Sequence, residues 1–401
     1  MYANSSLKLI IKPQNVIAHM LVFIIVFDLL LPSYFVGLMP SFVFLAFRLT
    51  SRFFMLLYVA VYGFQPTQPF WLITIIGLCG IVSTALRQGT SVAVLAEYTF
   101  IIIECAFLLS VIESDERASV LMTVVRNITL TFALANLLVG IVMPTGIPSL
   151  NVSGMYPRFL YGNVNSMMRS IMPGICCSMV LDKKKERIIS IPTILLFLSI
   201  LYFFRIYFMA TTFIGIVLLI AWIVLKVPIK RNYIKAYLAI VLVVLFIEVF
   251  VVFLFGNSSY ASFISGLFSM KTGFSGRERL WSNIIYRIQD RKMFGYGNMD
   301  QEQMRQLIGN AYGSHNYYLD VVFRRGIVGF IPLIILLLQP IIDKREDISD
   351  VSYTLLGCCC TYYLMFLMEP FIGTEYLHLP VFCITMSVLQ KEKKWRARIK
   401  F

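Results

Sequence analysis

Charged residues are scarce in this chain, and their scarcity excludes a soluble globular fold. Only 14% of the 401 residues are Asp, Glu, Lys or Arg, whereas 59% are hydrophobic and 14% are aromatic. Soluble domains carry roughly a quarter charged residues. Together with a mean hydropathy of +0.79, the composition predicts an all-α polytopic membrane protein. We expect a single integral membrane domain over residues 1–401.

Motifs for metal or nucleotide binding are also lacking. No His and Cys residues stand at the spacing of a metal site, and neither a Walker nor a dinucleotide fingerprint occurs. Of the eight Cys, Cys176–Cys177 and Cys358–Cys360 lie within apolar runs. That placement is typical of small buried hydrophobic residues rather than of a disulfide framework. The sequence therefore predicts no metal and no cofactor.

The chain also lacks an evident cleavable signal peptide and a basic groove for nucleic acid. Its first apolar run has no small-residue cleavage site, so we expect this run to remain as a helix. The net charge is +14, but the basic residues form short clusters between apolar runs. This pattern is typical of cytoplasmic connectors and indicates no nucleic-acid partner. The clusters are Lys8 with Lys12, Lys183–Arg187, Lys226–Lys235 and Lys391–Lys400, so both termini are expected in the cytoplasm.

Apolar runs long enough to cross a bilayer predict about twelve transmembrane helices, with eleven or thirteen as alternatives. Tyr34–Phe64 is ambiguous, because Arg48 and Arg52 divide it and leave either one tilted helix or a hairpin. One helix is preferred, because the number of crossings then agrees with the basic clusters. The runs are Val16–Leu31, Tyr34–Phe64, Phe70–Leu86, Val92–Ile112, Val120–Met143, Met167–Leu181, Ile188–Phe204, Phe208–Leu225, Tyr237–Phe255, Gly326–Ile342, Ser352–Met368 and Phe371–Leu389.

Asp28, Glu97 and Glu104 lie within apolar runs and need partners. A lone charge at bilayer depth costs about 3 kcal/mol or more, so Asp28 requires a counter-charge or a position at the end of its helix. Glu97 and Glu104 are seven residues apart and share one helix face, which should point into the bundle. They form either a structural hydrogen-bonded pair or the lining of a polar cavity.

Two polar intervals fall on the external face by this count of crossings. The loop 144–166 is rich in Pro, Gly, Asn and Ser, a composition typical of turns. The large loop 256–317 overlaps the longest polar stretch of the chain, which runs from Phe274 to Phe330. We expect the active site in this large loop.

Within the large loop, Ser275 and Glu278 fit a helix capping box. Arg277 and Arg279 fall in the first turn, where the helix dipole disfavours cations by about 0.3–1 kcal/mol each. Two such arginines indicate a bound anion, or side chains that reach lipid headgroups. The helix should lie on the membrane or the bundle by an apolar face made of Leu280, Trp281, Ile284, Ile285 and Ile288.

His315 is the one histidine in a polar loop, since His19 and His378 lie in apolar runs. It directly precedes an apolar helix expected to begin near Tyr317, and backbone N–H groups at such a helix start favour phosphate. Exposure and a near-neutral pKa would suit His315 to proton transfer. The alternative is a structural histidine.

Four short motifs in this order resemble the signature of the O-antigen ligase and polymerase family of bacterial membrane glycosyltransferases. They are the RFLYGNVN element at Arg158–Asn165, SGR-E-LW at Ser275–Trp281, GYG at Gly295–Gly297, and HN-YLD from His315 with Gly326 and Gly329 downstream. The resemblance implies a fold like that of helical, GT-C-like membrane glycosyltransferases. One departure is FMATTFIG (Phe208–Gly215), which lacks the arginine of the family's Ser-Arg-Thr element.

The resemblance implies that His315 and Arg277 are catalytic. It implies substrate-binding roles, on diphosphate or glycan, for Arg158, Arg279, Asn316 and Asn165, with Arg205 as the substitute for the missing arginine. The implied reaction moves glycan from an undecaprenyl-diphosphate carrier to a lipid-linked acceptor repeat unit. It takes place on the outer face of the bacterial plasma membrane and needs no metal if arginines neutralise the leaving group.

A polysaccharide polymerase of O-antigen or capsule biosynthesis is the preferred interpretation. The alternatives are a ligase that delivers glycan to another acceptor, and a transporter or flippase of lipid-linked oligosaccharides. The implied partners are the lipid-linked donor and acceptor, membrane lipids, and the flippase and chain-length regulator of the same pathway. A transporter should carry charges along several helices, whereas here the basic residues of interest concentrate in two external loops.

Overall fold

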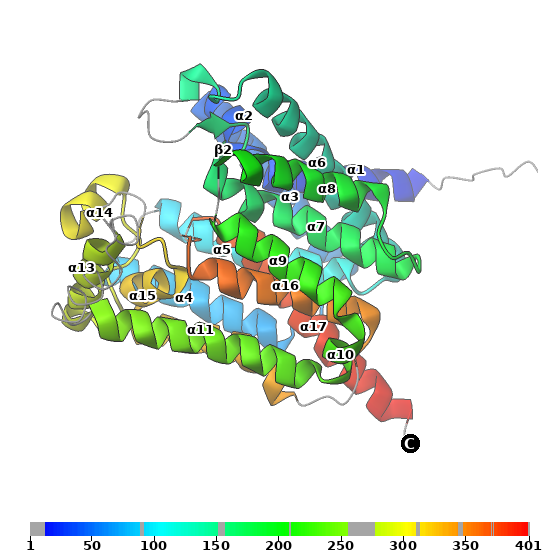
Figure 1. Ribbon diagram of the computed structural model, residues 1–401. Helices are drawn as coiled ribbons and strands as arrows, with labels where there is room; N and C mark the ends of the chain where they lie inside the picture. Colours follow the sequence, from blue (N-terminus) through cyan, green and yellow to red (C-terminus); the bar gives the residue numbers. More distant parts are fainter. Residues whose placement is uncertain are drawn as a thin grey trace, which may run out of the picture.

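The computed structural model describes residues 13–88, 92–150, 157–207, 210–255, 277–309, 313–343, 348–369, 371 and 373–399. These residues are almost wholly helical (Figure 1). The elements are α1 (Pro13–Leu30), α2 (Ser33–Leu38), α3 (Ser41–Tyr62), α4 (Gln68–Gln88), α5 (Val92–Val111), α6 (Asp115–Val142), η1 (Pro148–Leu150), β1 (Arg158–Phe159), β2 (Gly162–Asn163), η2 (Val164–Ser166), α7 (Met167–Lys184), α8 (Ile191–Tyr207), α9 (Ala210–Val224), α10 (Lys226–Arg231), α11 (Tyr233–Phe255), α13 (Arg277–Asp290), α14 (Gln301–Ile308), α15 (Tyr317–Ile342), α16 (Asp350–Phe366) and α17 (Glu375–Ile399).

Five of the described helices, α3, α4, α6, α11 and α15, are long and apolar enough to cross a membrane, and shorter apolar helices accompany them. Among the described residues, twelve helices have at least 15 residues. The class predicted from composition, an all-α membrane protein, is confirmed. The number of twelve crossings and the likeness to GT-C-type enzymes stay predictions.

The polar elements gather at opposite ends of the bundle. The helices α13 and α14 and the strand β2 lie at one end, and α10 and the end of α17 lie at the other (Figure 1). Ion pairs tie the basic connectors at this second end. Lys184 lies 3.1 Å from Asp115, Lys391 lies 2.6 Å from Glu113, and Lys226 and Lys230 both bind Asp350.

The predicted single helix over Tyr34–Phe64 is confirmed for most of its length, and the hairpin is excluded because α3 runs unbroken past Arg48 and Arg52. The predicted start is wrong, because a short α2 ends before Pro40 and α3 begins at Ser41. Proline has no N–H and disfavours helical geometry in the residue before it. The chain therefore turns at Met39–Pro40.

Asp28 has the partner that its position required. Its carboxylate lies 2.5 Å from Arg52 Nη1 and 3.4 Å from Arg48 Nε, and the Asp28 side chain is fully buried. Removing one member of a buried ion pair costs about 3–5 kcal/mol, because the other charge stays without a partner. This interaction fastens α1 to α3 and explains two arginines inside an otherwise apolar helix.

Surface labelling tests the expected orientation of the bundle. In a variant without the eight native cysteines, Gln306→Cys on α14 should react with an impermeant thiol reagent in intact cells. Lys185→Cys, which follows α7 at the opposite end, should react only after permeabilisation, because basic connectors stay in the cytoplasm. Both positions are exposed. The reverse pattern would place the large loop on the inner face and contradict the topology.

Candidate functional site

The start of α15 fixes the position of His315. The helix begins at Tyr317, as expected, and Asn316 is its N-cap, with Oδ1 accepting a hydrogen bond from Leu319 N at 3.0 Å. Asn316 Nδ2 also donates to Glu248 Oε1 of α11 at 2.7 Å. His315 directly precedes this cap and has a φ of 54°, in the left-handed region that non-glycine residues seldom occupy. The imidazole is therefore held on a sharp turn at the helix mouth.

Ser314 closes that turn from the other side. Its Oγ accepts a hydrogen bond from Asn316 N at 2.9 Å, and its N–H donates to Asp320 Oδ1 at 2.9 Å. Its carbonyl oxygen accepts a hydrogen bond from Trp281 Nε1 of α13 at 2.8 Å. The turn that carries His315 is thus bonded both to its own helix and to α13.

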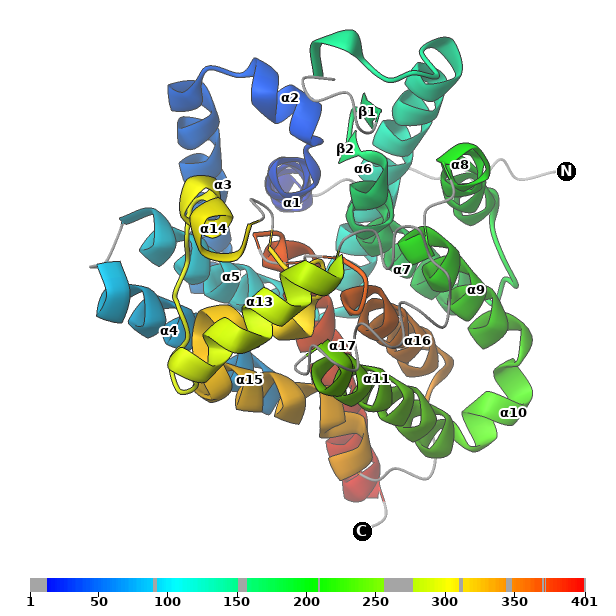
Figure 2. The same ribbon diagram turned by 60° about the vertical axis from the view of Figure 1, so that its left-hand side comes forward.

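The helix α13 has the apolar face predicted from sequence. Leu280, Trp281, Ile284 and Ile285 are buried, and Ile288 packs against the same cluster. The cluster includes residues of α11 and α15, so α13 lies on the bundle rather than away from it (Figure 2). Ser275 lies outside the described residues, so its predicted cap stays a prediction. Arg277, the first residue of α13, is partly buried, and its Nη1 lies 3.9 Å from Met368 Sδ.

The segment 291–300, which we call the glycine loop, repairs a break in α15. Gly326, with φ 65° and ψ −169°, interrupts the helix, so the amides of Ile327 and Val328 lose their usual partners four residues earlier. Carbonyl oxygens of the glycine loop accept hydrogen bonds from these two amides. Two amides of the loop in turn donate to the carbonyl oxygens that the break in α15 leaves free. The bonds join Ile327 N to Lys292 O, Tyr296 N to Phe323 O and Gly297 N to Arg324 O at 2.8 Å, and Val328 N to Met293 O at 3.2 Å.

Glycine is required on both sides of this junction. Gly295 and Gly297 have φ values of 65° and 73°, in the left-handed region that favours glycine. A Cβ on Gly326 would lie 2.0 Å from the carbonyl oxygen of Met293. The GYG motif and the glycine downstream of His315 are therefore two halves of one packing contact, which joins the end of α13 to α15.

A buried ionic network lies beneath the His315 turn. The Glu375 carboxylate at the start of α17 accepts a hydrogen bond from Tyr317 Oη at 2.8 Å and binds the Arg325 guanidinium. That guanidinium lies 4.9 Å from the centroid of the Tyr98 ring. The sequence reasoning missed Glu375 and Arg325, although the pair of arginines before Gly326 in an apolar helix was a usable signal.

Glu97 and Glu104 do not form the pair that was one expectation. Glu97 Oε2 accepts a hydrogen bond from Asn298 Nδ2 at 3.1 Å, and Asn298 Oδ1 accepts one from Arg324 at 2.7 Å. Glu104 lies beside the Asp28–Arg52 pair and lines an apolar cavity. The two carboxylates share a helix face, but different neighbours occupy its two ends.

His315 is half-buried and lies close enough to Arg277 for the two charges to interact. Burial, and then the positive charge of Arg277, lower the pKa of His315 to about 4. The expected near-neutral pKa is therefore wrong, and the free imidazole is neutral at pH 7. Its Nδ1 is buried and has no hydrogen-bond partner among the described residues.

The other predicted binding residues divide into two groups. Arg158 lies half-buried in β1, in a hairpin that bonds to α2 through Leu160 O, and Arg205 is exposed in the last turn of α8. Figure 2 shows β1, β2 and α8 well apart from α13 and α15. The side chains of Arg279 and Asn165 lie outside the described residues. The structure thus brings together His315, Arg277 and Asn316, but not Arg158 or Arg205.

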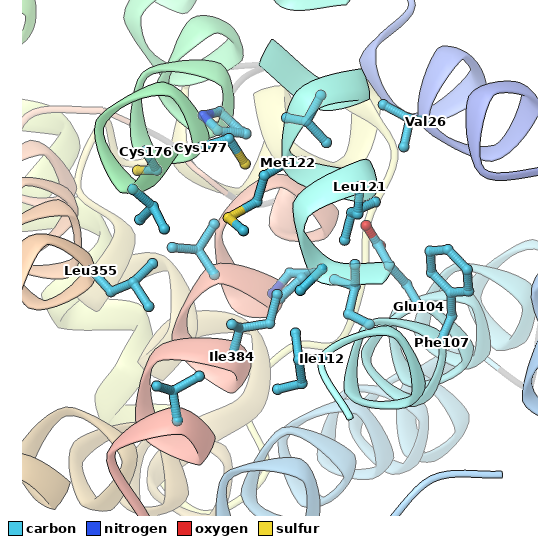
Figure 3. Close-up of a pocket in the computed structure, with 18 of the residues that line it drawn as sticks. Val26, Glu104, Phe107, Ile112, Leu121, Met122, Cys176, Cys177, Leu355 and Ile384 are labelled. Carbon is cyan, nitrogen blue, oxygen red and sulfur yellow. The ribbon is translucent and has the colours of Figure 1, made fainter. Parts of the chain in front are cut away.

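A cavity of about 490 Å³ lies among α1, α5, α6, α7, α16 and α17 (Figure 3). Its wall is apolar apart from a few polar groups such as Glu104, and it reaches Lys184 and Lys391 at the end of the bundle opposite α13. No residue of α13 or of the His315 turn lines it. This cavity is therefore separate from the site at the start of α15.

The described residues thus form a helical membrane protein that presents a histidine and an arginine at one end. Residues 188–334 match the model of a family described as "O-Antigen ligase". The resemblance to the O-antigen ligase and polymerase family is confirmed over this stretch, which contains α13, the glycine loop and His315. The RFLYGNVN element lies outside it.

A Haemophilus influenzae protein described as "Uncharacterized protein" is 32% identical over 80 residues. The aligned part covers 18% of this chain and 20% of that relative, so the chain spans about a fifth of the relative's length. No solved structure matches the chain.

Substitution of Gly326 tests the junction between α15 and the glycine loop. Gly326→Ala should lower the melting temperature in detergent markedly, because Cβ would collide with the Met293 carbonyl. Gly63→Ala is the matched control, since Gly63 has almost the same backbone conformation, with φ 67° and ψ 174°, but no atom lies within 4 Å of its added Cβ. The control should cost only the backbone strain, about 1–3 kcal/mol. Equal shifts for the two variants would show that the contact contributes nothing.

Proposed function

We propose that the protein is a glycosyltransferase that moves glycan from an undecaprenyl-diphosphate carrier to a hydroxyl of a lipid-linked repeat unit. The observation that carries the proposal is the pairing of His315, on its strained turn, with Arg277, inside the stretch that matches the family. The transfer takes place on the outer face of the plasma membrane, where the large loop is expected. Donor and acceptor are lipid-linked oligosaccharides.

The acceptor hydroxyl attacks the anomeric carbon of the donor glycan. A new glycosidic C–O bond forms, the bond to the diphosphate oxygen breaks, and undecaprenyl diphosphate leaves with the bonding electron pair. His315 takes the hydroxyl proton as general base. Arg277 faces the diphosphate and stabilises its growing negative charge through a planar fork of donors. The start of α15 adds the partial positive charge of a helix N-terminus.

The low pKa of His315 fits this role once the donor is bound. In the free protein, burial and Arg277 keep the imidazole neutral but make it a weak base. A diphosphate beside Arg277 offsets the arginine's positive charge and favours the protonated imidazole, so it raises the pKa of His315 towards its ordinary value. The base then becomes strong enough to accept a proton only when the donor is in place.

The buried charges favour an enzyme over a transporter. Asp28 with Arg52, and Glu375 with Arg325, form fully packed pairs that join helices, rather than a row of charges along a path. Polymerase and ligase share this chemistry and differ in the acceptor. We prefer a polymerase, which would work with the flippase and the chain-length regulator of its pathway.

Substitution of His315 tests the catalytic role. His315→Gln should reduce polymer formation about 10²–10⁴-fold, because the general base is lost. His19→Gln is the control, since His19 is exposed on α1 and should be neutral. The assay follows extension of purified lipid-linked repeat units, without any other acceptor, and the face of the membrane on which these units accumulate in cells.

Normal chain lengths from His315→Gln would end the catalytic assignment. Accumulation of repeat units on the inner face would favour a transporter. Transfer by the unaltered protein only after another acceptor is added would identify a ligase.

The pH profile tests the coupling between Arg277 and His315. In the unaltered protein kcat/KM should fall only as the pH drops through about 4, where the free imidazole gains its proton. Arg277→Gln removes the neighbouring cation, so the pKa of His315 rises and this acid limb moves to higher pH. Burial still holds the pKa below its ordinary value. Arg305→Gln, an exposed arginine of α14, should leave the limb in place. If the acid limb of the Arg277→Gln variant stays where it is in the unaltered protein, Arg277 does not lower the pKa of His315.

A further inference from the structure

Helix α6 exposes polar side chains on a face that should meet lipid. One side of α6 packs against α1, α7 and α8, and the helix lies at the edge of the bundle (Figure 1, Figure 2). On the opposite side Asn127, Thr131 and Leu138 are exposed, at spacings that place them on one helix face. Arg126 flanks this face and is half-buried. We call Arg126, Asn127 and Thr131 the α6 polar face.

The α6 polar face lies deep within a helix that can span the membrane. The helix, Asp115–Val142, is one of the described helices long and apolar enough to cross a bilayer. At 1.5 Å per residue, Arg126 lies about 16 Å from one end of α6 and about 24 Å from the other. The hydrocarbon core of a bilayer is about 30 Å thick. Arg126 is therefore at hydrocarbon depth, whichever end of α6 faces the cytoplasm.

Arg126 has no counter-charge in the part of the chain that the structure describes. None of the ion pairs among these residues includes it, whereas Arg52 of α3 binds the buried Asp28. Arg126 Nε donates a hydrogen bond to Asn127 Oδ1 at 3.0 Å, which holds the side chain against its own helix. Its Nη1 and Nη2 have no acceptor among the same residues. An arginine at this depth is costly and is paired in almost every case.

A second copy of this chain does not offer the counter-charge. The acidic side chains in the apolar parts of the described helices are buried or hydrogen-bonded within the bundle, namely Asp28, Glu97, Glu104, Asp182, Glu248, Asp320 and Glu375. Two copies related by a two-fold axis through the α6 polar face would also bring the Arg126 side chains of both copies together. Like charges repel in hydrocarbon, so the partner is a different protein.

We propose that the α6 polar face binds a transmembrane helix of another membrane protein, one that carries an Asp or Glu at mid-bilayer depth. The partner's carboxylate accepts hydrogen bonds from Nη1 and Nη2 of Arg126, in the two-pronged geometry that a planar guanidinium favours. Asn127 Nδ2 provides another donor beside them, and the small Thr131 lets the two helices approach closely. Figure 2 shows α6 apart from α13 and α15, so this inference does not depend on the transfer reaction.

Synthetic transmembrane helices of defined sequence test the proposal. Each is a peptide rich in Leu and Ala, with lysines at both ends and either Glu or Gln at its midpoint. The full-length protein in phosphatidylcholine liposomes carries a fluorescent donor, and the peptide carries the acceptor. The Glu peptide should bind about tenfold more tightly than the Gln peptide, because only a carboxylate neutralises Arg126.

Substitutions of Arg126 locate the binding on the α6 polar face. Arg126→Gln should remove the preference for the Glu peptide. Arg231→Gln is the matched control, because it deletes the charge of an exposed arginine on the short helix α10 and should leave the preference unchanged. Arg126→Glu should reverse the preference, in favour of a peptide with Lys at its midpoint. This reversal is a gain of binding, which a misfolded variant cannot show.

Three results would overturn the proposal. The first is equal binding of the Glu and Gln peptides by the unaltered protein. The second is loss of the preference when phosphatidylglycerol replaces phosphatidylcholine, which would make lipid phosphate the ligand of Arg126. The third is energy transfer between two labelled copies of the protein that Arg126→Gln abolishes, which would assign the α6 polar face to self-association.

Discussion

Backbone groups freed inside a helical membrane protein must find new partners, and this requirement shapes the whole site. The break at Gly326 frees two carbonyl oxygens and two amides of α15, and the glycine loop bonds all four. Because this loop directly follows α13, the junction fixes α13 to α15. Arg277 begins the first of these helices and His315 precedes the second. A local exchange of four hydrogen bonds therefore sets the relation between the two proposed catalytic residues.

The turn that carries His315 is also bonded to helices of the bundle. Tyr317 is the first residue of α15, and its hydroxyl bonds Glu375 of α17, which Arg325 neutralises. On the other side, Asn316 bonds Glu248 of α11. Three helices thus hold a left-handed residue that would otherwise relax, since such strain persists only where the surroundings impose it. The polar groups buried here bond one helix to another.

The sequence predicted those features that depend on local pattern. The start of α15 at Tyr317 and the buried face of α13 follow from apolar spacing, and both are confirmed. The need of Asp28 for a counter-charge follows from the cost of burying a charge, and Arg52 meets it. The predicted start of α3 at Tyr34 was wrong, because α3 begins after Pro40. The effect of a proline on the residue before it can be read from sequence, so this start was predictable.

Features that depend on distant neighbours were not predictable in the same way. The link between Glu375 and Tyr317 joins residues 58 positions apart, and periodicity carries no information about such a pair. Glu97 and Glu104 share a face, but Asn298 meets only one of them. The pKa of His315 depends on burial and on the approach of Arg277, both of which come from the fold. The sequence identified His315, and the structure changed its expected pKa.

That change bears on the order of events at the proposed site. A histidine with a pKa of about 4 is a poor base while the site is empty, so its base strength depends on the bound donor. Under the proposed mechanism the diphosphate raises this pKa, and by linkage a protonated His315 binds the diphosphate more tightly. After transfer, the proton and the released carrier then hold each other in the site. Loss of the proton weakens that attraction, so departure of the carrier and recovery of the base become one event.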